Sequence, residues 1–107
     1  MPAAKFEACK ELTAAGISAA YAAVGNPTEK RVKAFLVSNA TQGDLWITWD
    51  TSIEMFPVLA GSFVLIDVAS NKQNLGEDAY YLAVGTQFYC KQITAPVDNS
   101  LYISCLY

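Results

Sequence analysis

The hydrophobic residues of this 107-residue chain are grouped in short runs from Ile17 onward. Turn-forming Gly, Pro, Asn and Asp residues interrupt the runs every ~8–12 residues, a spacing typical of all-β sandwiches and barrels. The pattern therefore predicts an all-β fold, an antiparallel β-sandwich of jelly-roll type with about eight strands. The expected strands are Ile17–Val24, Arg31–Asn39, Leu45–Asp50, Glu54–Leu59, Ser62–Val68, Ala79–Val84, Thr86–Ile93 and Ser100–Tyr107.

Three of these runs also indicate where a strand lies in its sheet. The third run alternates strictly, so Trp46 and Trp49 are expected on opposite faces. The fourth run contains Pro57, which cannot donate to a sheet ladder and predicts an edge or bulged strand. The fifth run, Ser62–Val68, is almost continuously apolar. We therefore expect it in the centre of a sheet or against a partner.

The first 16 residues have a different pattern. They are rich in helix-forming residues, with Phe6, Cys9 and Leu12 at positions i, i+3 and i+6. This spacing predicts a short helix over residues 3–15, and an extended arm that orders on a neighbour is the alternative. In either form we expect residues 1–16 to act as an assembly element, with the β-sandwich domain spanning residues 17–107.

Composition adds the expectation of a partner. Apolar residues make up 53% of the chain and charged residues only 16%, against a norm of about 25% charged. A chain of this length folds as one domain and, at this composition, is expected to hide part of its surface. The polar stretch Ser70–Asp78 is expected to be an exposed loop.

Charge and hydropathy argue against several other classes of partner. The formal net charge of −3 predicts no strong attraction for nucleic acid or anionic lipid. There is no apolar run of ~18 residues that would predict a membrane span, and charges interrupt the N-terminal segment where a signal peptide would be apolar. We therefore expect no nucleic acid, membrane or small-molecule substrate as a partner, and no export by that route.

Common catalytic and ligand-binding groups are missing from the sequence. The chain has no histidine, the usual base near neutral pH and the commonest metal ligand. Cys9, Cys90 and Cys105 have no C-x-x-C spacing, so neither a zinc site nor a thioredoxin-like motif is indicated. We expect buried free thiols rather than a Cys90–Cys105 disulfide. The isolated glycines form no phosphate-binding loop. The sequence thus predicts no enzyme, no cofactor and no metal.

Four carboxylates, Asp44, Asp50, Glu54 and Asp67, could in principle converge as an acid/base pair or a cation site. Their spacing matches no calcium loop, and each lies at an expected strand end or turn. Aspartate is commonly a solvated turn former at such positions. The tripeptide from Asn39 to Thr41 fits the glycosylation pattern, which matters only in a secreted protein.

Several segments carry a resemblance to a known group of proteins. From Ile17 the chain has Ile-Ser-Ala-Ala-Tyr-Ala-Ala-Val-Gly-Asn-Pro, followed by a strand ending in Asn39-Ala40-Thr41 with Asp44 close behind, and then by Ile47-Thr48-Trp49-Asp50. In this order the segments resemble small virion structural proteins of tailed bacteriophages.

Three further segments are similar to motifs of this family. Val58–Asp67 is similar to the family's P-A-G-S-F turn into a central strand, although the proline stands earlier here, as Pro57. Gly85–Lys91 is similar to its G-T-Q-I-Y-V-K strand, and Ser100–Ser104 to its closing S-V-Y-V-S strand. The resemblance covers about residues 17–107.

The resemblance implies a non-catalytic structural protein, most directly a capsid decoration or cement subunit that binds the outside of the head and stabilises the shell. Its implied partners are the major capsid protein and copies of itself, on a virion made in the bacterial cytoplasm. We expect the interface to include Phe6, Cys9, Leu12, Trp46 and Tyr107. Two alternatives stay open: a tail or head-to-tail joining component, and a carbohydrate-binding module that uses exposed aromatic side chains.

Overall fold

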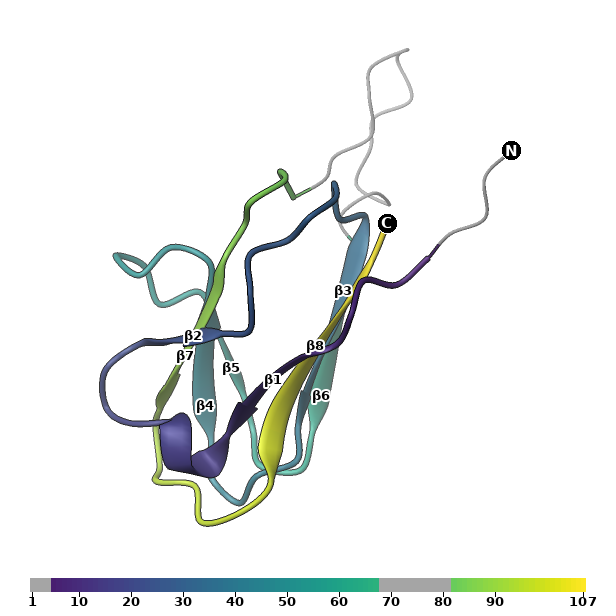
Figure 1. Cartoon of the computed structure of the whole chain (residues 1–107). Coiled ribbons are helices and arrows are strands. Elements are labelled where there is room, and N and C mark those ends of the chain that lie inside the picture. The colour runs from purple at the N-terminus through teal and green to yellow at the C-terminus, as the bar shows by residue number, and fades with distance from the viewer. Residues whose placement is uncertain (1–4, 68–81) are drawn as a thin grey trace.

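The computed structural model describes residues 5–67 and 82–107 and shows an all-β fold (Figure 1). In this part of the chain, eight strands form two four-stranded antiparallel sheets, and the helical content is a single 3-10 turn, η1 (Ala14–Gly16). The prediction of an antiparallel β-sandwich with about eight strands is confirmed. The strands are β1 (Lys10–Thr13), β2 (Ala22–Val24), β3 (Ala34–Asn39), β4 (Leu45–Thr48), β5 (Phe56–Val58), β6 (Phe63–Asp67), β7 (Phe88–Gln92) and β8 (Ser100–Leu106).

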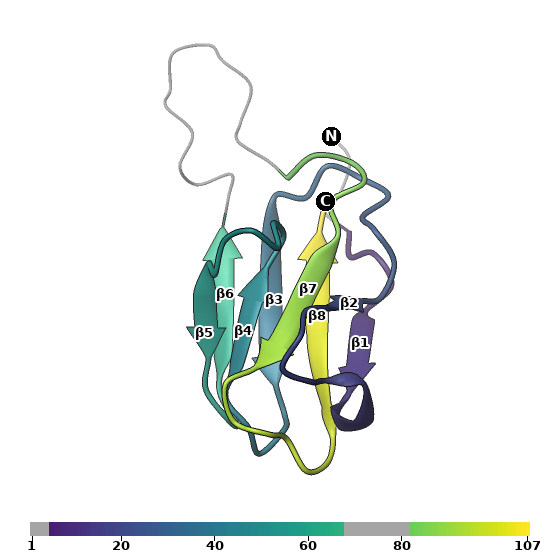
Figure 2. The same cartoon turned by 90° about the vertical axis from the view of Figure 1, so that its left-hand side faces the viewer.

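The strands pair in a nested order. Sheet A has the order β1-β8-β3-β6 and sheet B the order β2-β7-β4-β5. Within them β1 pairs with β8, β2 with β7, β3 with β6 and β4 with β5, always antiparallel. Figures 1 and 2 show the two sheets as two layers with the core between them. The first four strands therefore pair, one by one, with the last four in reverse order.

Aromatic side chains from both sheets meet in the core. The ring of Phe35, from β3 in sheet A, lies 5.1 Å from that of Phe88, from β7 in sheet B. Trp49, directly after β4, packs edge-on against both rings, at 5.6 and 6.1 Å. The predicted alternation of the third run is confirmed, because Trp49 packs against the core while Trp46 projects from the other face of β4. The buried hydrophobic residues are Ile17, Val24, Val32, Phe35, Val37, Leu45, Ile47, Val58, Leu82, Phe88, Cys90, Leu101, Ile103 and Cys105.

A buried asparagine joins the two sheets at one end of the sandwich. Asn39, the last residue of β3, is 1% exposed. Its side-chain amide donates to the carbonyl oxygens of Gly43, at 2.8 Å, and of Val58 in sheet B, at 3.0 Å. Its side-chain oxygen accepts from the N–H and the hydroxyl of Thr41, at 3.0 and 2.6 Å. The amide is fully hydrogen-bonded, as burial requires, and it is inaccessible as a glycosylation acceptor in the folded chain.

The N-terminal segment is extended and belongs to sheet A. Lys5 and Tyr107 exchange two backbone hydrogen bonds, at 3.0 and 2.7 Å, and β1 pairs with β8 over its whole length. For the described residues the expected helix over 3–15 is wrong. The segment is extended, as in the alternative, but it pairs with β8 of the same chain, and its ordering on a neighbour stays a prediction. The sheet begins at Lys10, so the segment assigned above to an arm ending at residue 16 contributes a strand. The reason is tertiary: the edge of β8 satisfies the backbone groups of β1, whereas a helix this short is marginal without packing.

The fifth expected strand lies at an edge of sheet A. β6 pairs with β3 on one side, and no described strand pairs with its other side. Val64 and Ile66 pack against the core, while Phe63 and Leu65 are exposed. The expected central position is therefore wrong, because an apolar outer face on an edge strand produces the same continuous apolar run. The alternative, that this strand lies against a partner, stays a prediction.

Some of the remaining expectations concern residues that the structure describes, and others fall outside them. Pro57 lies in β5, an edge strand of sheet B, as predicted. Half of the expected strand Ala79–Val84 lies outside the described residues; in the other half, Leu82 forms a β-bridge with Val32. The expected loop Ser70–Asp78 lies wholly outside them. No helix in the described ranges is long and apolar enough to cross a membrane.

Candidate interaction surface

The outer face of sheet A is largely apolar. Side chains opposite one another on neighbouring antiparallel strands share a face and form rows across the sheet. In one row Leu65 of β6 lies opposite Leu36 of β3, which lies opposite Ser104 of β8. The next row consists of Phe63, Ser38 and Tyr102.

Large hydrophobic side chains of this face are open to solvent. Phe63 is 69% exposed, Leu65 65%, Phe6 66% and Tyr102 38%. Phe6 reaches the face through its β-bridge to Leu106. Between Phe6 and Leu65 lies a shallow apolar hollow of about 120 Å³, lined also by residues of β3 and β8. Contiguous exposed apolar surface of this kind marks interaction sites. The apolar face is defined here by Phe6, Leu36, Phe63, Leu65, Tyr102 and Leu106.

The edges of the two sheets are protected to different degrees. In sheet B, the edge strand β5 carries Pro57 and the edge strand β2 is only three residues long. In sheet A, β1 carries charged side chains, whereas the five-residue β6 has neither lysine nor proline. Short length, charge and proline are the devices that keep edge strands from pairing with other chains. β6 is therefore the least protected of the described edges.

Sheet B presents a more polar outer face. Lys91 of β7 forms an ion pair with Glu54 at 2.8 Å, and its ammonium lies 4.7 Å from the ring centroid of Tyr21. The hydrogen bond to Glu54 raises the pKa of Lys91 above its usual value. Trp46 lies opposite Lys91 on the neighbouring strand and is half-buried. The apolar face of sheet A thus has no counterpart on this side among the described residues.

The five predicted interface residues do not form one surface. Phe6 is exposed on the apolar face, and Cys9 is exposed beside β8. Leu12 packs against the core, because it lies opposite the buried Leu101 of β8 and shares the inner face of sheet A with it. Trp46 lies on sheet B, and Tyr107 is half-buried at the end of β8. Their role in an interface stays a prediction.

Other residues of the apolar face were not identified from the sequence. Phe63 and Leu65 belong to the apolar run Ser62–Val68, which was expected either in the centre of a sheet or against a partner. This run was the one sequence signal that pointed to them. Leu36, Tyr102 and Leu106 share that surface only through the pairing of β3 and β8 with β6. No local pattern reveals such a non-local arrangement.

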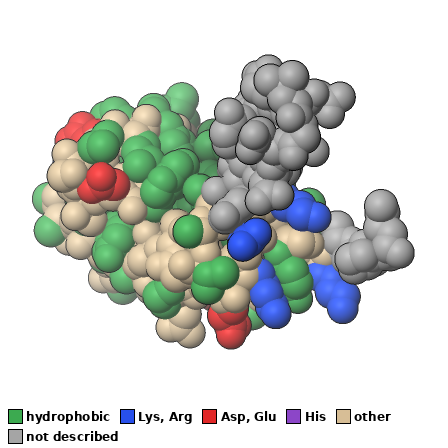
Figure 3. All heavy atoms as spheres, turned by 90° about the horizontal axis from the view of Figure 1, so that it is seen from above, with side chains coloured by type: hydrophobic (Ala, Val, Ile, Leu, Met, Phe, Trp, Pro, Cys, Tyr) green, Lys and Arg blue, Asp and Glu red, His purple; other side chains and the backbone are tan. Residues whose placement is uncertain are grey.

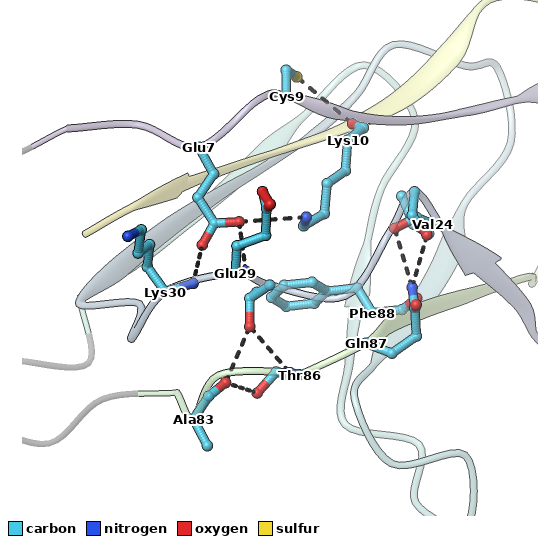
Figure 4. A network of polar contacts seen from close by, with 12 residues as sticks. Glu7, Cys9, Lys10, Val24, Glu29, Lys30, Ala83, Thr86, Gln87 and Phe88 are labelled. Atoms are coloured by element: carbon cyan, nitrogen blue, oxygen red, sulfur yellow. Dashed lines mark hydrogen bonds and ion pairs between the residues drawn. The ribbon is translucent and has the colours of Figure 1, made fainter.

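A buried carboxylate holds the N-terminal segment against the connection between β2 and β3 (Figure 4). The two carboxylate oxygens of Glu7 accept from the backbone N–H groups of Glu29 and Lys30, at 3.1 and 3.0 Å. The ammonium of Lys10 lies 3.8 Å from the same carboxylate, and both side chains are about 5% exposed. Gly25 lies against Lys10 with a φ of +63°, where a side chain would be both strained and obstructed. This cluster borders a polar hollow of about 420 Å³, and its contacts are those of a structural clamp.

Exposed basic side chains gather at one end of the sandwich (Figure 3). Lys5 and Lys33 are placed there by backbone hydrogen bonds to the last two residues of the chain, and the ammonium of Lys30 lies 5.8 Å from the ring of Tyr107. Arg31 is also exposed on the same connection. Counted over the described residues, this end carries a cluster of positive charges, although the chain has a formal charge of −3. The basic end comprises Lys5, Lys30, Arg31 and Lys33.

All three cysteines are free. Cys90 lies on β7 in sheet B and Cys105 on β8 in sheet A, and both are buried, which confirms the expected buried free thiols at these two positions. Burial raises the pKa of Cys90 to about 12 and that of Cys105 to about 11. Both thiols therefore stay protonated near neutral pH, where the thiolate would be the reactive form.

The carboxylates considered above serve local structure. Asp44 accepts from the backbone N–H of Ala60 at 2.9 Å. Asp50 accepts from the hydroxyl and the N–H of Ser52, and these hydrogen bonds lower the pKa of Asp50. Glu54 forms the ion pair on sheet B. Within residues 5–67 and 82–107, no group of three or more His, Cys, Asp or Glu side chains is placed to hold a metal ion.

Comparison with known proteins adds no relative: no protein-family model, no curated protein and no solved structure matches this chain.

Proposed function

We propose that this chain is a non-catalytic structural protein of a tailed-bacteriophage virion, a capsid decoration or cement subunit on the outside of the head. The observation that carries the proposal is the apolar face of sheet A, exposed on a small β-sandwich. The sequence resemblance supplies the virion context. The partners under this proposal are the major capsid protein and copies of the same chain.

The surface of the sandwich suits attachment to a protein lattice. The apolar hollow beside Phe6 adjoins the segment that carries Lys5, so apolar and positively charged surface lie close together. Protein interfaces commonly combine a desolvated apolar centre with a polar or charged rim. We assign capsid attachment to the part of the apolar face around Phe6 and Leu106, with the basic end contacting acidic groups of the shell.

Such a subunit stabilises the shell by linkage. A ligand that binds only the assembled shell adds RT ln(1 + [L]/Kd) to its stability, about 2.7 kcal/mol per site at a free concentration of 100 Kd. The contribution repeats at every occupied site. Decorated heads should therefore withstand more heat and internal pressure than undecorated ones.

The test uses heads assembled without this chain. Purified protein is added back, bound protein is measured by co-sedimentation, and the temperature of genome release is followed with a DNA-binding dye. We expect wild type to bind and to raise the release temperature. Phe6→Ser should bind at least tenfold more weakly. Val97→Ser is the matched control, because Val97 is 82% exposed in the loop between β7 and β8, away from the apolar face.

The outcomes separate the proposal from its alternatives. Hundreds of copies per particle support decoration, whereas about six to twelve copies, in a ring, would place the chain at the tail or its joint instead. Sub-millimolar glycan binding without binding to heads would favour the carbohydrate-binding alternative. If wild type neither binds the heads nor alters their release temperature, the decoration proposal is wrong.

A further inference from the structure

No described strand pairs with the outer edge of β6, and this edge has the features of a self-pairing strand. We propose that two copies of this chain pair β6 with β6 in antiparallel orientation, around a two-fold axis at Leu65. The pairing would join two four-stranded A sheets into one continuous sheet. It deepens the proposed function by naming the surface through which copies meet, and it requires no capsid.

The backbone of β6 has the correct hydrogen-bonding groups on its free side. Hydrogen-bonded and non-hydrogen-bonded pairs alternate along antiparallel strands. The N–H of Asn39 donates to the carbonyl of Ser62 at 2.9 Å, which places Val64 and Ile66 in the hydrogen-bonded pairs with β3. The N–H and C=O groups of Phe63 and Leu65 therefore point away from β3, toward the free edge. The free edge of β6 thus presents alternating N–H and C=O groups, and a second strand can form hydrogen bonds with all of them at once.

The side chains favour one register. With the axis at Leu65, the two copies of Leu65 face each other, and Phe63 of each copy faces Asp67 of the other. The sole charge of β6, on Asp67, then lies opposite an aromatic ring rather than opposite itself. A parallel pairing would bring the two Asp67 carboxylates close together, and like charges at such positions are destabilising. Charge distribution therefore selects the antiparallel pair.

The exposed area of β6 indicates the strength of the pair. A fully buried aromatic side chain covers about 150–250 Å². Phe63, at 69% exposed, contributes only part of its open area, because a strand added at the edge covers it from the side and leaves the outer face of the sheet open. Leu65 is exposed to a similar degree. The edge alone gives an interface at the small end of specific complexes, which lies below roughly 1,200 Å² in total. We therefore expect a weak dimer whose population depends on protein concentration. Phe6 and Leu106 stay available for the shell.

The test measures the oligomeric state of the full chain by sedimentation velocity from sub-micromolar to several hundred micromolar protein. Two variants, Phe63→Asp and Phe63→Lys, remove the same ring but introduce opposite charges opposite Asp67 of the second copy. We expect Phe63→Asp to weaken dimerisation at least tenfold, and Phe63→Lys to stay within about threefold of wild type at low salt. The difference in dimerisation between the two variants should shrink in 1 M salt, because salt screens both the repulsion between the introduced aspartate and Asp67 and the attraction between the introduced lysine and Asp67.

Two controls test the register and the fold. Val97→Asp and Val97→Lys make the same changes in net charge at a distant exposed position, and they should leave dimerisation unchanged. The charge exchange Phe63→Asp with Asp67→Lys should restore the dimer that Phe63→Asp alone loses. Far-UV circular dichroism checks that each variant is folded. If Phe63→Lys is unfolded, the double variant Phe63→Asp with Asp67→Lys tests the register in its place.

The proposal is overturned if wild type stays monomeric over the whole range, or if the two Phe63 variants dimerise equally. It is also overturned if the Val97 variants show the same difference. A monomer that still binds heads would refute the β6 pair and leave the proposed function intact. A dimer with the predicted charge dependence that binds no heads would support the β6 pair and refute the proposed function.

Discussion

Replacing Asn39 by aspartate exchanges one side-chain nitrogen for oxygen without changing the shape of the side chain. In the folded protein that nitrogen donates to the carbonyl oxygens of Gly43 and Val58, at 2.8 and 3.0 Å. A carboxylate oxygen at this position faces two acceptors and has no donor. The contacts with Thr41 are retained, because Thr41 donates to the other oxygen. The substitution therefore isolates the link that Asn39 makes between the two sheets.

The expected magnitude follows from the groups left without partners. In Asn39→Ala, the hydroxyl of Thr41 can still donate to the carbonyl of Gly43, 3.1 Å away. The carbonyl of Val58 and the N–H of Thr41 lose their partners, at about 1–3 kcal/mol each. We expect Asn39→Ala to lower the free energy of unfolding by about 4 kcal/mol. Asn39→Asp should lose at least as much at pH 7, because its buried charge is also unpaired.

The two variants should differ in their response to pH. Burial and the two facing carbonyls raise the pKa of the introduced carboxyl in the fold above its unfolded value of about 3.9. The folded variant therefore binds a proton more tightly than the unfolded chain. Its penalty relative to wild type is full above the raised pKa and shrinks as pH falls toward about 3.9. The penalty of Asn39→Ala has no such dependence.

Urea denaturation followed by tryptophan fluorescence, to which Trp49 against the core contributes, provides the assay at several pH values. The matched control is Asn99→Asp, the same change at an exposed residue with a φ of +67°, which should alter the stability by less than about 0.5 kcal/mol. If Asn39→Asp is as stable as wild type at pH 7, or if its penalty is independent of pH, the reasoning from the buried amide is wrong.

Two further predictions concern buried groups. Glu7→Gln should lower the free energy of unfolding by about 1–3 kcal/mol, because two charge-assisted hydrogen bonds weaken and Lys10 loses its ion pair; a change below about 0.5 kcal/mol in urea denaturation would show that Lys10 is solvated another way. The buried thiols of Cys90 and Cys105, with pKa values of about 12 and about 11, ionise near pH 9 once the chain unfolds, so stability should fall as pH rises above 9. Cys90→Ala should reduce that fall, and native-state alkylation followed by mass spectrometry should label Cys9 alone.

The features of the fold that the sequence determined by itself are those that depend on a few neighbouring residues. Alternation predicted that Trp46 and Trp49 lie on opposite faces, because successive side chains of a strand point to opposite faces. The structure shows that Trp49 is the one that packs against the core. Pro57 predicted an edge strand, since proline has no N–H for a central ladder. Each of these properties depends on a residue and its immediate neighbours, which is why the sequence was sufficient.

Tertiary structure alone decided the role of β1 and the position of β6. Phe6, Cys9 and Leu12 have helical spacing, but the open edge of β8, some ninety residues away, makes the extended form the one whose backbone groups are satisfied. The apolar run of β6 is compatible with a central strand or with an edge strand that has an apolar outer face. Only its pairing with β3 on one side distinguishes them. The apolar face likewise exists only once β3, β6 and β8 lie side by side, because sheet neighbours are set by long-range pairing and not by the period of any one strand.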